Sequence, residues 1–239
     1  MEQNKVTTYV LYALGEILLV VAGILIALQV NNWNEQKKRE SFELAILQEL
    51  DSSLEVDSTL IADYFLPRLE RKERGIDSLK WYSGMAKDIS PEQFMDLYED
   101  AREGFDYRFN IGPYETIKSK GLELISNPEL RNQITTMYEL TFPAYQNFMN
   151  QVEDENSPLI EELEQEFLKV DLRKNEDNEW MVYDIPDSDA ILRHPSFMRA
   201  LFLEVEIAEN YRSRLNNVMQ YRKELHDSIR QELIKRNSI

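Results

Sequence analysis

The feature that most constrains this chain is an apolar run, YVLYALGEILLVVAGILIALQV, which extends from Tyr9 to Val30. As an α-helix the run would be roughly 33 Å long, close to the thickness of about 30 Å of a bilayer's hydrocarbon core. Glu16 is the one charged side chain in it. The run therefore predicts a transmembrane helix over residues 9–31, in contact with the lipid bilayer.

Aromatic side chains flank the run where membrane interfaces would lie. Tyr9 and Tyr12 stand near its start and Trp33 follows its end, and amphipathic aromatic rings prefer the headgroup zone. We therefore expect these three residues to anchor a span. A cleaved signal peptide is one alternative, but a cut after Ala27 would place the bulky Leu25 at position −3, where a small residue is needed. A buried core helix is the other, and it is rarely apolar on every face.

One face of the expected span combines a carboxylate with small residues. Glu16, Gly23 and Ala27 share this face at helical spacing. Gly23 and Ala27 form a small-xxx-small pair that lets helices approach closely, and a carboxylate in a span usually faces a partner, water or the interface. We expect the three residues to form a transmembrane association face. The alternative is that Glu16, roughly 10 Å inside the boundary, extends its side chain to the headgroups.

The same region carries a resemblance to a known family. The stretch from Tyr12 to Glu35, YALGEILLVVAGILIALQVNNWNE, resembles the signature of an uncharacterised family of single-span proteins from Gram-negative bacteria, catalogued as a domain of unknown function. A second segment, Tyr114 to Arg131, is similar to a repeated segment of that family in which a turn follows a short helix. The resemblance implies a bacterial inner-membrane protein with a periplasmic helical domain, and it supplies no activity.

The charges around the span leave its orientation open. Family members usually carry a basic stretch before the span, whereas Lys5 is the one basic side chain there in this sequence. Lys37, Lys38 and Arg39 follow the span, and the flank richer in cations usually stays in the cytoplasm. Taken alone, this pattern would place the C-terminal domain inside, but we expect the periplasmic orientation that the resemblance implies.

The composition excludes several classes of function. A formal net charge of −17 gives a surface that repels nucleic acid, because phosphate binding needs a cationic patch. The same charge would keep the soluble part off anionic lipid. The sequence contains no cysteine, which excludes disulfides, thiol nucleophiles, iron–sulfur clusters and cysteine-based zinc sites.

Sparse glycine and proline, together with one-sided apolar stripes, predict an all-α fold. The 239 residues include 7 glycines and 8 prolines, which favours long helices over many short strands. A stripe at helical spacing from Phe42 to Phe65 indicates a helix that runs on from the membrane, and Pro67 is expected to kink or end it. A near-heptad stripe predicts a last helix from about Pro195 to Arg236.

Two long helices that bracket several shorter ones predict an elongated antiparallel bundle, in which the last helix returns towards the membrane. We therefore divide the chain into a short tail (1–8), a transmembrane helix (9–31) and an acidic helical soluble domain (32–239).

Local signals place the shorter elements. Asn127 is expected to cap a helix that starts with Pro128, and Gly121 to end one in the left-handed conformation. A separate helix is expected to start at Ser157-Pro158 and continue to Val170. Within the polar stretch that follows, residues 180–183 are expected to be extended.

The sequence shows no catalytic set. Its two histidines, His194 and His226, lack the spacing of zinc or di-iron helix motifs, and no glycine-rich phosphate loop is present. We therefore expect no enzyme, no catalytic residue, no metal site and no cofactor. The basic cluster Arg71, Lys72 and Arg74 and the acidic run 161–166 are expected to be exposed helix charges.

Three functions remain compatible with the sequence. The leading hypothesis is an interaction or scaffold protein that forms a homo-oligomer or binds another membrane protein. The second is a subunit of an ion-coupled or transport complex that uses Glu16. The third is a helical bundle that senses a small ligand of unknown identity.

Overall fold

The computed structural model describes residues 3–85, 87–104, 108–175, 177–187 and 190–237, and the side chains from residue 11 to residue 236 within these ranges. Helices make up 82% of the structure, which confirms the all-α prediction. The main helices are α1 (Gln3–Leu60), α2 (Leu66–Met85), α3 (Pro91–Ala101), α4 (Gly112–Lys120), α5 (Pro128–Thr136), α6 (Phe142–Glu164) and α7 (Pro195–Asn237). Short turns η1 (Ile61–Phe65), η2 (Leu122–Leu124), η3 (Met137–Thr141) and η4 (Ile191–Arg193) and two strands, β1 (Leu168–Lys174) and β2 (Trp180–Pro186), complete the described fold.

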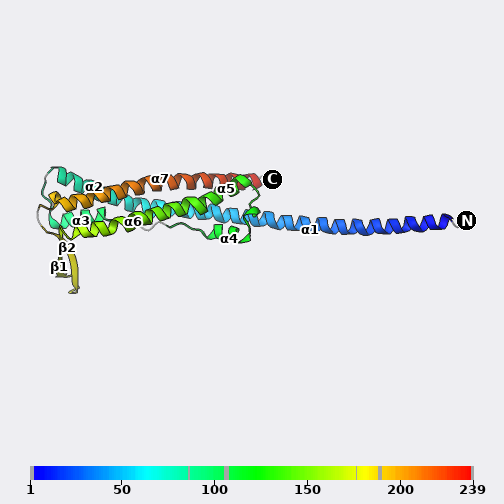
Figure 1. The fold of residues 1–239 in the computed structure, drawn as a ribbon, viewed down its shortest axis with the longest axis horizontal. Coiled ribbons are helices and arrows are strands. Elements are labelled where there is room, and N and C mark those ends of the chain that lie inside the picture. The colour runs from blue at the N-terminus through cyan, green and yellow to red at the C-terminus, as the bar shows by residue number, and fades with distance from the viewer. Residues whose placement is uncertain (1–2, 86, 105–107, 176, 188–189, 238–239) are drawn as a thin grey trace.

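The elements form an elongated bundle with one helix projecting from it (Figure 1). The rod α1–η1–α2 leads from the N-terminus to the far end of the bundle, and α5–η3–α6 runs in the same direction. Helix α7 runs antiparallel to both, so that Arg236 near its end reaches Glu43 on α1. The predicted return of the last helix along the first is therefore confirmed.

Both long rods contain one widened π-helical turn, and a proline explains each. Pro67 and Pro143 stand just beyond η1 and η3. A proline ring clashes with the carbonyl four residues earlier and offers no N–H to it. The wider turn relieves this clash. The residue before each proline donates its N–H to a carbonyl five residues earlier: Leu66 donates to Ile61, and Phe142 donates to Met137. Pro67 therefore leads to a local widening, and the rod continues into α2.

The core lies where the apolar stripes of α1, α2, α6 and α7 meet. Ile46, Leu50 and Leu54 on α1 are buried, as the stripe predicted. Gly75 brings α3 unusually close to α2, because a Cβ there would stand 2.7 Å from the backbone oxygen of Leu97. Helices α2 and α3 therefore pack closely at the end of the bundle far from the projecting helix.

The region from Ser157 to Pro186 differs from the prediction. Helix α6 passes through Pro158 without ending, because Met149 and Ile160 on either side are both buried against the core. It then ends at Glu164, and β1 begins at Leu168, so that the expected helix to Val170 is wrong. The extended segment predicted around residues 180–183 is β2, which pairs antiparallel with β1 in a hairpin that projects from the bundle.

Candidate functional site

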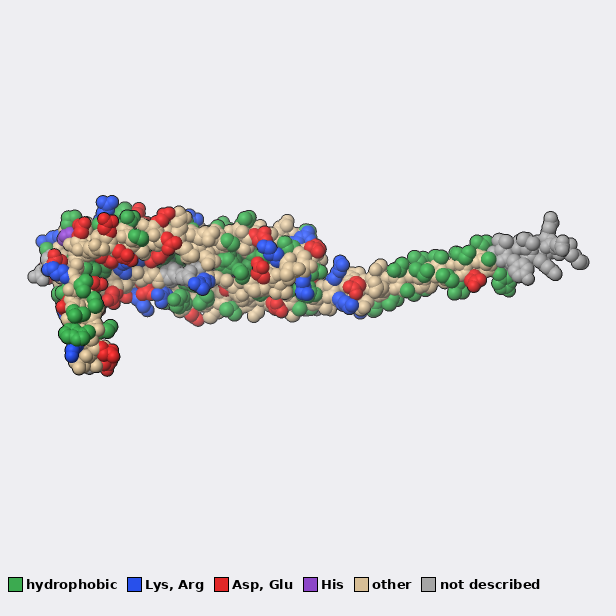
Figure 2. Space-filling model, turned by 60° about the horizontal axis from the view of Figure 1, so that its bottom comes forward, with side chains coloured by type: hydrophobic (Ala, Val, Ile, Leu, Met, Phe, Trp, Pro, Cys, Tyr) green, Lys and Arg blue, Asp and Glu red, His purple; other side chains and the backbone are tan. Residues whose placement is uncertain are grey.

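The N-terminal half of α1 is an apolar rod outside the bundle. The sequence from residue 24 to residue 66 contains no glycine or proline, so nothing in it interrupts the helix between the apolar run and the bundle. Every described side chain from residue 11 to residue 40 is exposed, and Figure 2 shows the rod largely covered by hydrophobic side chains. Among the described residues, this is the one helix long and apolar enough to cross a membrane.

The structure places the predicted association face on this rod. Glu16, Gly23 and Ala27 lie in one uninterrupted α-helix, all exposed, and a Cβ added at Gly23 would meet nothing within 4 Å. A shallow hollow beside Glu16 is lined by Leu11, Tyr12, Gly15 and Leu19. Gly15 had no role in the sequence prediction, although its missing side chain is the signal that would have located the hollow.

The predicted interface anchors occupy the two ends of the apolar segment. Tyr12 is exposed near its start, and the side chain of Tyr9 lies outside the described residues. Trp33 is exposed beyond its end, with the Lys37 ammonium 4.0 Å from the centre of its ring. Trp33 and Lys37 therefore combine an aromatic ring and a cation at one level of the rod, as side chains in a headgroup zone do.

A cluster of charged and polar side chains, Glu43, Asn127, Glu232 and Arg236, holds the bundle together where the rod enters it; we call this cluster the clasp. The Arg236 guanidinium on α7 donates to both carboxylate oxygens of the buried Glu43 on α1, at 2.9 and 2.7 Å. Glu43 also accepts the backbone N–H of Ser126 at 2.7 Å. Glu232, bonded to Arg236, accepts from Asn127, whose own side chain caps α5 as predicted. One carboxylate thus joins three segments of the chain.

Replacing Arg236 with alanine is expected to open this end of the bundle locally. Glu43 would be left buried without its cation, at a cost of about 3 kcal/mol. Amide hydrogen exchange near the end of α7 should then accelerate roughly 100-fold if it proceeds by this opening. Arg230→Ala is the matched control, because the Arg230 guanidinium is exposed and water screens its ion pairs with Asp51 and Glu55. Equal acceleration in both variants would contradict the role of the clasp.

A second buried carboxylate, Asp57, lies in the middle of the bundle. Its side chain is 5% exposed; Oδ1 accepts the backbone N–H of Asn110 at 3.3 Å, and among the described residues Oδ2 has no hydrogen-bond partner. Burial raises the pKa of Asp57 to about 6, although the Asn110 bond and the charge of Arg222 oppose this rise. Asp57 is therefore a titratable group inside the core.

A buried ion network occupies the far end of the bundle. Lys72 on α2 and Glu204 on α7 form an ion pair, with exposed fractions of 2% and 1%, and Lys72 also donates to the carbonyl of Ala101 at 2.6 Å. The expectation that Lys72 is an exposed helix charge is therefore wrong. Lys72 lies on the same helical face as Leu69 and Ile76, both buried, and this spacing was the signal that could have located it.

The network continues from Glu204 towards the hairpin. Arg102 donates to Glu204 at 2.9 Å and to Glu164 at 3.0 Å, and the Tyr98 hydroxyl donates to the same oxygen of Glu164 at 2.8 Å. Burial raises the pKa of Glu164, and the carboxylates of Glu204 and Asp184 raise it further against the effect of Arg102. Glu164 belongs to the acidic run that was expected to be a solvated face, and here it turns inward.

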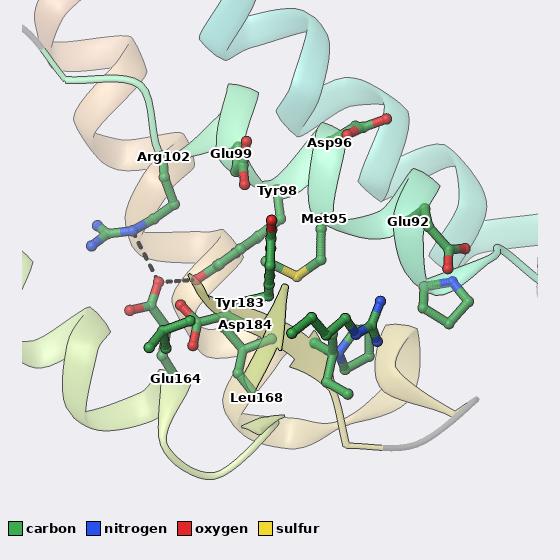
Figure 3. Close-up of a pocket in the computed structure, with 15 residues that line it drawn as sticks. Glu92, Met95, Asp96, Tyr98, Glu99, Arg102, Glu164, Leu168, Tyr183 and Asp184 are labelled. Atoms are coloured by element: carbon green, nitrogen blue, oxygen red, sulfur yellow. Dashed lines mark hydrogen bonds and ion pairs between the residues drawn. The ribbon is translucent and has the colours of Figure 1, made fainter. Parts of the chain in front are cut away.

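A cavity of about 670 Å³ opens beside this network, between α3 and the hairpin. In Figure 3, Met95 and Tyr98 point from α3 towards the hairpin, Tyr183 points back from β2, and Asp184 lies beside Glu164. The remaining lining residues are Pro91, Glu92, Asp96, Glu99, Arg102, Leu168, Arg173, Val182, Ile185 and Pro186. The volume lies within the range of small-molecule sites, about 300–1,000 Å³.

The other predicted candidates do not form a site within the described residues. His226 is buried on α7, with Nε2 2.9 Å from Asp51, and His194 precedes α7. Over the described part of the chain, no group of three or more His, Asp or Glu side chains could hold a metal ion.

Comparison with known proteins identifies a family. No curated protein and no solved structure matches the chain. A family of unknown function, DUF6090, matches residues 16–175, from Glu16 in the apolar run to the residue after β1. This match agrees with the resemblance carried by the apolar run. Because it spans more than half of the chain, the protein belongs to this family of unknown function.

Proposed function

We propose that this protein is a membrane-anchored interaction protein without enzymatic activity, which associates with a second copy of itself through the Glu16–Gly23–Ala27 face. The observation that carries the proposal is the exposed apolar rod of α1. No part of its most apolar segment is buried inside the fold. An apolar surface of this extent in a soluble protein marks an interface with lipid or protein. A bilayer would cover most of it, and a partner helix would cover Glu16.

Self-association is favoured over a purely lipid-exposed helix because of the position of Glu16. Its carboxyl group lies on the surface of the rod, and the small residues Gly23 and Ala27 follow about two and three helical turns further along. In lipid, such a group is stabilised by a hydrogen bond across a helix pair, and the small residues allow the backbones to come close enough.

The triple variant Glu16→Gln, Gly23→Ile and Ala27→Ile is expected to dissociate the oligomer. Two isoleucines would separate the backbones, and glutamine would remove the carboxylate while keeping hydrogen-bonding capacity. The measurement is the mass of the full chain extracted in mild detergent. Val21→Ile with Leu25→Ile, on the opposite side of the helix, is the matched control and should leave the mass unchanged. A wild-type protein that is monomeric in mild detergent would contradict the proposal.

The proposed location is a bacterial inner membrane with the bundle in the periplasm, as the family resemblance implies. The absence of cysteine makes a direct test possible, since Ser119→Cys would introduce the one reactive thiol on an exposed position of α4. A membrane-impermeant maleimide applied to cells with a permeabilised outer membrane should label it. Labelling that requires lysis of the inner membrane would place the bundle in the cytoplasm.

An ion-coupled complex is the second candidate, and Glu16 is the observation that favours it. A protonatable group in a span can carry a proton. Under this proposal the single variant Glu16→Gln abolishes coupling while the complex stays assembled. Full function of that variant in cells would leave only the association role.

A further inference from the structure

We propose that the cavity between α3 and the hairpin binds an organic cation, an amine whose ammonium group lies beside Glu164 and Asp184 and whose apolar body packs against Met95, Leu168 and Ile185. This site lies at the end of the bundle far from the apolar rod (Figure 1), and the inference does not depend on the proposed association of the span.

The charge balance of the lining selects a cation. Acidic residues border the cavity from three elements: Glu92, Asp96 and Glu99 on α3, Glu164 on α6 and Asp184 on β2. The two guanidinium groups of the lining are already engaged, since Arg102 bonds Glu204 and Glu164, and Arg173 pairs with Asp171. Within the described residues, Asp184 and the three α3 carboxylates have no ion-pair partner, so the cavity keeps an excess of negative charge.

The geometry places the two most suitable carboxylates together. Asp184 lies beside Glu164 in Figure 3, and its charge contributes to the raised pKa of Glu164. Arg102 and Tyr98 both bond to Oε1 of Glu164, so that neither of them engages Oε2. An ammonium group at this point would separate two like charges and would be held by charge-assisted hydrogen bonds.

The other walls suit the body of the ligand. Met95, Leu168 and Ile185 are half-buried and apolar, and the rings of Tyr98 and Tyr183 approach the cavity from opposite sides. Aromatic faces attract cations as well as apolar groups. A cavity with these walls distinguishes an amine with an apolar body from an inorganic cation, which would gain nothing from them.

The test uses the full chain in mild detergent and three probes of one shape: 2-phenylethylamine, 2-phenylethanol and phenylacetate. Calorimetric titration should show the amine binding at least fivefold more tightly than the alcohol, and no binding of the anion. Methylamine should bind more weakly than 2-phenylethylamine, because each buried methylene strengthens binding by about fourfold. Equal affinity for amine and alcohol, or for the two amines, would overturn the proposal.

Two variants separate the site from the general acidity of the surface. Asp184→Asn removes one carboxylate of the pair and is expected to weaken the binding of 2-phenylethylamine about fivefold. Asp154→Asn, on an exposed position of α6 outside the cavity, makes the same change of net charge and should leave the affinity unchanged. Both variants are titrated in the same micelles, so that partitioning of the probe into detergent cancels. Equal weakening in the two variants would reduce the effect to non-specific attraction by the acidic chain and overturn the site.

Discussion

Replacing Lys72 with methionine is expected to lower the free energy of unfolding by about 3 kcal/mol, because Glu204 would remain as a buried charge without its closest cation. Arg102 still donates to Glu204, which keeps the expected loss near the lower end of the range for broken buried pairs. In thermal unfolding this corresponds to a fall in Tm of roughly 6–12 °C for a chain of this size.

A second replacement should reverse most of this loss. In the double variant Lys72→Met with Glu204→Leu, both buried charges are absent, and replacing a whole buried pair with apolar side chains is often neutral. Lys80→Met is the control, since Lys80 is exposed and lies 3.6 Å from the exposed Asp77. If the double variant were as unstable as Lys72→Met, or less stable, the unpaired charge of Glu204 would not be the cause of the loss.

The variant Asp57→Asn is expected to be more stable than the wild type at pH 7.5, by about 2–3 kcal/mol. The pKa of Asp57 rises from 3.8 in the unfolded chain to about 6 in the fold, so the native state binds this proton more tightly. Stability from this group is fully present below pH 3.8 and is lost as the pH rises through 6, a total of about 3 kcal/mol. Asparagine keeps an oxygen for the N–H of Asn110 and carries no charge.

The measurement is chemical unfolding of both proteins from pH 3.5 to pH 7.5. The difference in unfolding free energy should be close to zero at the acidic end and should grow between pH 4 and pH 6.5. Tracking the difference removes the effect of the other titrating groups, which the two proteins share. A difference that does not vary with pH would show that Asp57 titrates at the same pH in both states.

The sequence predicted the elements whose cause is local. The long helices follow from apolar spacing, the cap at Asn127 follows from its side-chain oxygen, and the positive φ of Gly121, 110°, follows from the absence of a Cβ. The continuation of α6 through Pro158 depends on burial of Met149 and Ile160 in one core. Local helix-start and helix-stop signals cannot reveal that packing, which outweighs the energetic cost of a proline inside a helix.

The same distinction between local and tertiary causes applies to the candidate sites. The placement of Glu16, Gly23 and Ala27 on one helix was predictable, because it depends on local spacing alone. The cavity was not predictable, because its acidic residues come from α3, α6 and β2, and the first three residues of β1 were predicted to end a helix. A hairpin that folds towards α3 is a tertiary event, and Asp184 acquires its neighbour Glu164 only when that event occurs.

Under the proposed membrane anchoring, the uninterrupted passage of α1 from the apolar rod into the bundle would let the protein act as a lever. From Asn31 to Met85 the rod α1–η1–α2 is roughly 80 Å long at 1.5 Å per residue. Spanning helices tilt by about 20° on average, and a tilt of that size would carry the far end roughly 27 Å sideways. With the rod anchored in a bilayer as proposed, small rotations of the anchored end would produce large displacements at the hairpin, and a force on the hairpin would be transmitted back to the anchored end.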